Sequence, residues 1–118
     1  MIAPVPTRRL HDGSVVPYDS AAWIAECEAR TILRMDTGKQ RDFLALLEQK
    51  RGDGAVRKVR DLMFVIEPAY LLDLPGQEAR RAYLHRVEMD RGHNARTHLE
   101  ARSLALWESR KPAKGTAA

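Results

Sequence analysis

The sequence has one cysteine, few aromatic residues and no long apolar run. Cys27 alone excludes a disulfide within the chain and is typical of proteins that fold in a reducing compartment. No apolar stretch approaches the roughly 20 residues that a helix needs to span a bilayer. The opening stretch MIAPVPTRRL lacks the apolar core of an export signal. With 31% charged residues, we expect a soluble, cytoplasmic protein with no membrane association.

The sequence also lacks the motifs of common catalytic and metal sites. There is no glycine-rich phosphate loop, no GxSxG elbow and no HExxH. Cys27 shares the apolar helical phase of its neighbours, which favours a buried side chain over a nucleophile. Glu48 and Glu88 recur on different predicted helices, and no histidine recurs with them. Three histidines lack the spacing of a zinc site: His85, His93 and His98. We therefore expect no enzyme activity, no metal and no cofactor.

Two stretches forty residues apart are near copies. RDFLALLEQKRG starts at Arg41 and RAYLHRVEMDRG at Arg81, and 6 of the 15 positions from residue 41 to 55 are identical to those from 81 to 95. A helix-turn-helix unit of this length cannot bury its apolar stripe alone, so a second copy supplies the missing surface. The pattern predicts an all-α fold, a small helical bundle of two tandem repeats of about 40 residues. A pseudo-twofold monomer and a homodimer both stay open.

The repeats divide the chain into a short arm, a helical domain and a tail. Residues 1–18 hold three of the six prolines, and Asp12-Gly13 favours a two-residue hairpin turn, so this arm is predicted to be extended or a hairpin. Residues 19–110 form a single helical domain, with repeat one over 19–66 and repeat two over 67–110. Residues 111–118 are predicted to be a disordered basic tail.

Capping signals predict where the helices of the first repeat begin. Asp19 or Ser20 caps a helix that ends near Met35. Four side chains share one of its faces and are predicted to be buried: Ile24, Cys27, Thr31 and Met35. Thr37 and Gln40 have the spacing of a capping box for a second helix.

Glycine and proline predict where helices end. Gly52 and Gly92 each follow a basic turn, where the left-handed conformation of a helix C-terminus suits glycine. Asp53 or Gly54 starts a third helix, and Pro68 ends that helix or starts the next.

The strongest charge feature is KRGDGAVRKVR, which crosses the predicted turn at Gly52. The net charge is only +4, because 20 basic residues are interspersed with 16 acidic ones. A solvated surface is the simpler interpretation of this stretch, but it could also contact phosphates. Five residues would then bind nucleic acid: Lys50, Arg51, Arg57, Lys58 and Arg60. Base-specific reading is disfavoured, because Glu48 stands where a DNA-reading unit usually has a small residue.

A protein interface is the other candidate site. Tryptophan is enriched at interfaces because it contributes a large contact area with few rotatable bonds, although core edges use it equally. The candidate interface residues are Trp23, Trp107, Arg80 and Arg81.

The stretches ECEARTILRM, RDFLALLEQKRG, YLLDLPGQEARRAYLHRVEMDRG and LALWESR resemble short, arginine-rich helical proteins of proteobacterial prophages and mobile elements. The resemblance covers about residues 20–110, with the unit doubled, and the first copy departs from it at Met35-Asp36-Thr37. It implies an origin in a phage or mobile element. By analogy with other small helical phage proteins, we expect a non-catalytic binding protein that acts on a host protein or nucleoprotein complex, for example as an anti-CRISPR or other anti-defence inhibitor. The alternative is largely nonspecific nucleic-acid binding through the stretch from Lys50 to Arg60.

Overall fold

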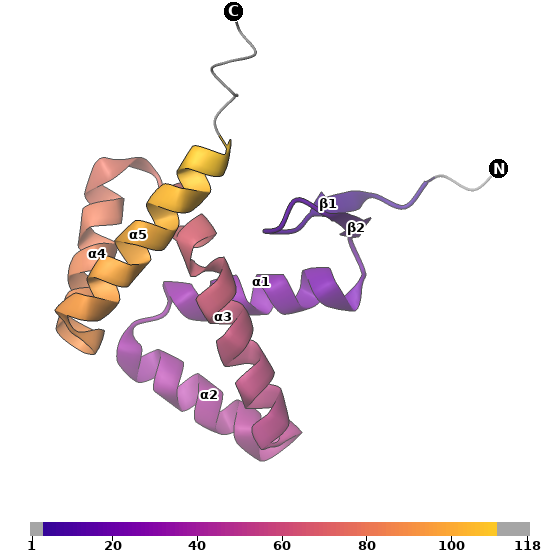
Figure 1. The fold of residues 1–118 in the computed structure, drawn as a ribbon. Coiled ribbons are helices and arrows are strands. Elements are labelled where there is room, and N and C mark those ends of the chain that lie inside the picture. The colour runs from indigo at the N-terminus through magenta and orange to yellow at the C-terminus, as the bar shows by residue number, and fades with distance from the viewer. Residues whose placement is uncertain (1–3, 111–118) are drawn as a thin grey trace, which may run out of the picture. The chain divides into compact units, whose positions relative to one another are not determined.

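The computed structural model describes residues 4–110, as a short antiparallel hairpin followed by five helices (Figure 1). The elements are β1 (Thr7–Arg9), β2 (Val15–Pro17), α1 (Ala21–Arg34), α2 (Thr37–Arg51), α3 (Asp53–Asp73), α4 (Gly76–Arg91) and α5 (His93–Arg110). The all-α prediction and the N-terminal hairpin are confirmed. The predicted tail, 111–118, lies outside the described residues. No helix within residues 4–110 is both long and apolar enough to cross a membrane.

The hairpin places Arg8 opposite Val16 and closes through a three-residue loop, not the predicted two-residue turn. The Leu10 amide donates to the Ser14 carbonyl at 2.8 Å, which leaves residues 11–13 as the loop. Gly13, at φ +90°, supplies the positive φ that such loops require before the second strand.

The chain divides into two compact units, with the boundary between Glu67 and Pro68. The first contains the hairpin, α1, α2 and residues 53–67 of α3, and the second contains residues 68–73 of α3 with α4 and α5. Each unit has its own apolar cluster. That of the first is Ile32, Leu44, Leu47 and Val56. That of the second is Leu71, Tyr83, Val87 and Leu99.

The two clusters use equivalent positions of the repeat. Ile32 and Leu71 stand thirty-nine residues apart, and Leu47 and Val87 stand forty apart. All four side chains are buried. The tandem duplication predicted from sequence is therefore also a duplication of core positions.

Pro68 neither ends a helix nor starts one, contrary to the prediction. It lies inside α3, which continues to Asp73. Proline removes one backbone donor from a helix interior and crowds the preceding turn. Because Ala69 and Leu71, just beyond it, are buried, side-chain packing offsets that cost. Local propensity alone could not reveal this.

A single glycine connects the paired helices within each repeat. Gly52 has φ +89° and ψ 171°, and Gly92 has φ +97° and ψ 168°. Their amides donate to the carbonyls of Glu48 and Glu88 at 2.8 and 2.9 Å. The predicted positive φ is confirmed, but ψ is extended and not left-handed helical. That region of backbone space is almost exclusive to glycine.

The buried face of α1 differs from the predicted one. Ser20 is the N-cap, and its Oγ accepts from the Trp23 amide at 3.3 Å. Ile24 is 59% exposed, and Thr31 is exposed with its hydroxyl donating to its own helix. The buried residues are Glu26, Ala29, Ile32 and Leu33. The helix is thus rotated so that a carboxylate, rather than Ile24, faces the interior.

The N-terminus of α2 also differs from the prediction. Asp36, not Thr37, is the N-cap, and its Oδ1 accepts from the Lys39 amide at 2.9 Å. Gln40 does not complete a capping box, because its Nε2 donates to the Met35 carbonyl at 3.1 Å. Aspartate is as good an N-cap as serine and better than threonine, so the true cap lies one residue earlier.

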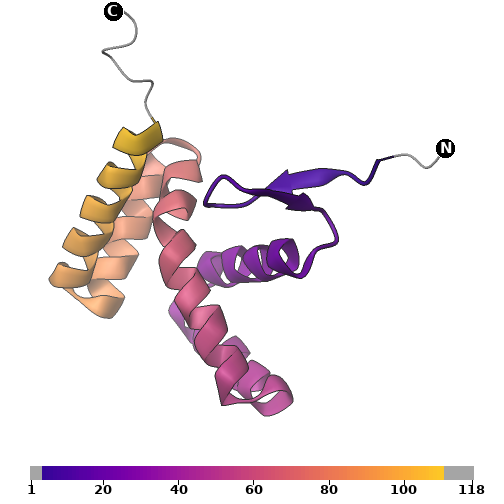
Figure 2. The ribbon, with the colours of Figure 1, turned by 45° about the vertical axis from the view of Figure 1, so that its right-hand side comes forward.

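The two helices joined by a glycine turn lie closer together in the second unit than in the first. α4 and α5 lie side by side along their lengths, whereas α2 and α3 diverge from the turn at Gly52 (Figure 1 and Figure 2). Ser103 of α5 stands where α3 has Met63, and a small side chain lets helices approach. Ser103 is only 5% exposed.

We expect Ser103→Ala to stabilise the second unit by about 1 kcal/mol, because the buried Ser103 hydroxyl has no hydrogen-bond partner among the described residues. Urea denaturation, monitored by hydrogen exchange of the α5 amides, measures the effect. Ser109→Ala is the matched control. Its hydroxyl is exposed and donates to the Leu106 carbonyl at 2.6 Å, so its effect should be near zero. Loss of stability in Ser103→Ala would show that the hydroxyl has a partner.

Candidate functional site

The basic stretch predicted to contact nucleic acid lies in the first unit, on both sides of the turn at Gly52. All five cations are exposed. Two of them form ion pairs, Arg51 with Glu28 at 3.2 Å and Arg57 with Asp53 at 3.3 Å. The remaining three have no ion pair among the described residues: Lys50, Lys58 and Arg60.

A small hollow lies on the surface of α2. It has a volume of about 120 Å³ and is lined by Phe43, Leu46, Leu47, Lys50 and Arg51, and we call it the α2 hollow. These positions are three and four residues apart, so they form one stripe along the helix. Leu47 is buried in the core cluster, whereas Leu46 is 47% exposed. The hollow therefore has an apolar floor beside two basic side chains.

The predicted interface residues are distributed over both units. Trp23 lies half-buried on α1 in the first unit. Arg81 is exposed on α4, and Arg80 is half-buried, with its Nη1 donating to the Leu74 carbonyl at 3.4 Å. Arg80 of α4 thus donates to a carbonyl just before its own helix, as Gln40 of α2 does.

Trp107 lies beside another exposed apolar residue on α5. Trp107 is 47% exposed and Leu104, one turn earlier, is 58% exposed. We call this pair the α5 apolar face. The sequence identified Trp107 but not Leu104, because Leu104 could equally have belonged to the core stripe.

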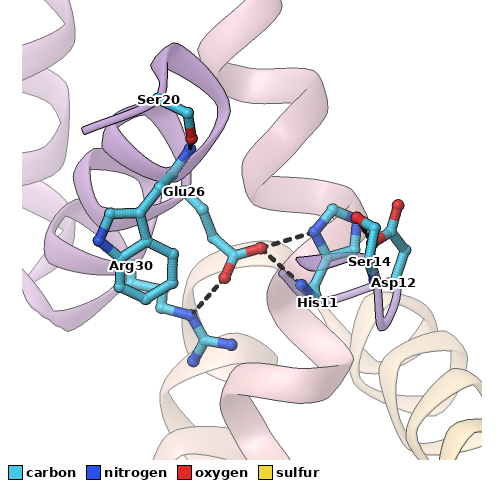
Figure 3. Close-up of polar contacts among 7 residues, drawn as sticks. His11, Asp12, Ser14, Ser20, Glu26 and Arg30 are labelled. Atoms are coloured by element: carbon cyan, nitrogen blue, oxygen red, sulfur yellow. Dashed lines mark hydrogen bonds and ion pairs between the residues drawn. The ribbon is translucent and has the colours of Figure 1, made fainter. Parts of the chain in front are cut away.

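A buried carboxylate that the sequence did not identify joins the hairpin to α1 (Figure 3). Glu26 is 2% exposed, and its Oε1 accepts from the His11 backbone amide and lies 2.7 Å from His11 Nδ1. Its Oε2 lies 3.6 Å from Arg30 Nε. A buried charge needs such partners to be tolerated. Because His11 is fifteen residues away, no local spacing predicts this contact.

Cys27, on the same helix, is half-buried. Within residues 4–110, no three histidine, cysteine, aspartate or glutamate side chains are grouped closely enough to hold a metal ion.

A second polar network crosses the turn at Gly92. The oxygens of Glu88 lie 2.9 Å from His93 Nδ1 and 2.8 Å from Arg96 Nη1, and Arg96 Nε donates to Glu100 at 3.1 Å. Residues three apart on a helix can pair, but Glu88 pairs across the turn with His93 and Arg96. Arg51 pairs with Glu28 of α1 and not with Glu48 of its own helix.

These contacts shift two pKa values. Hydrogen bonds from His93 and then Arg96 lower the pKa of Glu88 below its ordinary value. Hydrogen bonds to Glu88 and Glu100 raise the pKa of Arg96.

We expect the Glu88 network to stabilise the second unit in a pH-dependent way. Because the folded pKa of Glu88 is lowered, the stabilisation is present above the ordinary glutamate pKa and is lost as pH falls through the lowered value. The urea midpoints of the native chain and of Glu88→Gln should therefore differ at about pH 7 and lie closer together at an acidic pH well below the ordinary glutamate pKa. When both chains also carry Arg96→Met, the difference between their urea midpoints should be smaller. A gap between native and variant that is the same at both pH values would contradict the assignment.

The model of a family of unknown function, DUF7696, matches the chain twice in tandem, over residues 16–69 and 67–110. The chain belongs to the DUF7696 family. No curated protein and no solved structure shows a match to the chain. The first DUF7696 copy spans α1, α2 and most of α3, and the second starts near the end of α3 and includes α4 and α5. Both copies include a part of α3, since the two matches overlap at residues 67–69.

The two DUF7696 copies differ at the α2 hollow. The counterparts of its lining residues are Tyr83, Arg86, Val87, Asp90 and Arg91. Arg86 replaces Leu46, and its Cζ lies 4.8 Å from the centroid of the Tyr83 ring. In the second copy a guanidinium of the chain itself thus covers the aromatic face that corresponds to Phe43.

Proposed function

We propose that this DUF7696 protein is a non-catalytic binding protein whose partner is another protein. The observation that carries the proposal is the α5 apolar face, where Leu104 and Trp107 are 58% and 47% exposed one helical turn apart. Tryptophan is among the side chains that supply most of the energy of protein interfaces, and an exposed leucine beside it adds apolar area that a partner can bury. α5 buries Leu99 and Ser103, whereas about half of the surface of Leu104 and of Trp107 stays open to a partner.

The resemblance to prophage helical proteins supports a more specific version of this proposal. In it, the protein originates from a phage or mobile element and binds a host protein or nucleoprotein complex in the cytoplasm. Anti-CRISPR or other anti-defence inhibition is the activity that we propose to test in this version.

Nucleic-acid binding is the second candidate. The exposed side chains of Lys50, Lys58 and Arg60 favour it, since each phosphate neutralised by a cation adds salt-sensitive affinity. The ion pairs of Arg51 and Arg57 weaken it, because those cations already have carboxylate partners.

Affinity capture from nuclease-treated cell extract tests the first candidate. The full-length chain should retain a protein that the double variant Leu104→Ser/Trp107→Ser loses. Met89→Ser is the matched control, because Met89 is 72% exposed on α4 outside this face, and it should retain the protein. Capture that is equal for the native chain and the double variant would contradict the proposal.

Titration with duplex and single-stranded oligonucleotides at two salt concentrations tests the second candidate. Binding that weakens steeply with salt and is lost in Lys58→Ala/Arg60→Ala would establish nucleic acid as the ligand. The first proposal predicts no such binding even at low salt.

A further inference from the structure

The α2 hollow combines an apolar floor with a basic rim, and it lies in the first unit, on a different helix from the α5 apolar face. We propose that it binds an acidic amphipathic helix, by taking one apolar side chain into the hollow and pairing flanking carboxylates with Lys50 and Arg51. This inference rests on the proposed function in one respect, that the partner is a protein. It adds a second surface and the chemistry of the segment bound there.

The size of the hollow limits what it can hold. Its volume of about 120 Å³ is well below the roughly 300–1,000 Å³ typical of pockets for small ligands and cofactors. It suits a single apolar side chain. Phe43 is half-buried and Leu46 is 47% exposed, so an inserted side chain would cover apolar surface that is now partly in water.

The positive charge beside the hollow favours a bound segment that carries negative charge next to the inserted side chain. Lys50 has no ion pair among the described residues, and Arg51, whose side chain is 56% exposed, shares its charge with Glu28. On a bound helix, residues three and four positions from the inserted side chain lie on the same face. Glutamate or aspartate at those positions would reach the basic rim. A nucleic acid could satisfy the cations, but its phosphates would leave the apolar floor uncovered.

The second DUF7696 copy provides an internal comparison. There Arg86 lies over the Tyr83 ring, and Asp90 takes the place of Lys50. At the equivalent face, a guanidinium therefore lies over the aromatic ring, and a carboxylate stands where the first copy has the Lys50 cation. Positions 46 and 50 distinguish the copy that would bind an acidic helix from the copy that would not.

The test uses the full-length chain and fluorescence anisotropy with a designed labelled peptide that presents leucine and glutamate on one helical face. The native chain should bind it, and a peptide with lysine for glutamate should not bind. Leu46→Arg and Lys50→Asp install the residues of the second copy, and each should raise the Kd at least about tenfold. Lys50 is exposed, so Lys50→Asp should leave the fold intact. It therefore tests peptide binding even if Leu46→Arg perturbs folding. Circular dichroism verifies the fold of each variant.

Arg86→Leu, in the second copy, is the matched control. It should leave the affinity for the acidic peptide unchanged, because Asp90 still stands where the first copy has Lys50. Absence of binding by the native chain, equal binding of both peptides, or insensitivity to both first-copy variants would overturn the inference. Competition by a duplex oligonucleotide would assign the surface to nucleic acid instead. Leu104→Ser/Trp107→Ser should bind the peptide normally, so failure at the α2 hollow is distinguishable from failure of the proposed function.

Discussion

Valine at Gly52 or Gly92 is expected to destabilise the protein by about 3 kcal/mol in each case, because both glycines hold a backbone conformation that side chains with a Cβ avoid. Their φ angles are +89° and +97°, with ψ near 170°. A Cβ at either site would meet no atom within 4 Å. The whole cost therefore comes from the backbone and not from a clash. Urea denaturation, compared with the native chain, measures it.

Gly54→Val is the matched control for this prediction. Gly54 lies two residues beyond Gly52, also has open space around it, and has no positive φ. Valine is at least as favourable as glycine inside a helix, so the control should be near neutral. If all three valine variants unfold at the same urea concentration as the native chain, the one-residue turns do not require glycine.

Replacing Glu26 with alanine is expected to cost roughly 2–4 kcal/mol, because it leaves the His11 amide and the Arg30 guanidinium without their buried acceptor. Glu26→Gln keeps an oxygen for the amide and should cost less. Hydrogen exchange reports the effect directly, since the His11 amide should lose protection in Glu26→Ala.

Glu28→Ala is the comparison for Glu26. Glu28 lies on the same helix and pairs with Arg51, whose side chain is 56% exposed. Surface ion pairs contribute about 0–1 kcal/mol, so its loss should be small. Equal effects of the two substitutions would mean that Glu26 does not hold the hairpin.

The repeat and its glycine turns were predictable because they depend on local sequence. Arg41 to Gly52 and Arg81 to Gly92 have the same helical phase, and glycine after a basic turn ends a helix whatever lies nearby. The buried face of α1 was not predictable from periodicity. Ile24 follows the apolar pattern, yet Glu26 is the residue that is buried, because its partner His11 comes from a separate element.

The candidate sites were predictable only in part. The basic stretch and Trp107 are visible in sequence because their residue types are unusual. Phe43, Leu46 and Leu47 all have the pattern of a core stripe, and only the structure shows that Leu46 is 47% exposed. In the second copy Arg86 lies over the Tyr83 ring, a contact that residue types alone do not predict.

The sharing of α3 between the two DUF7696 copies has a consequence for how such chains can be cut or extended. No loop separates the copies, so a fragment intended to carry only one must keep part of a helix that also serves its neighbour. Because the two copies share α3, a longer chain of this kind needs few additional helices. An added copy could begin on the last helix of its predecessor, so that each extension would require two new helices and not three.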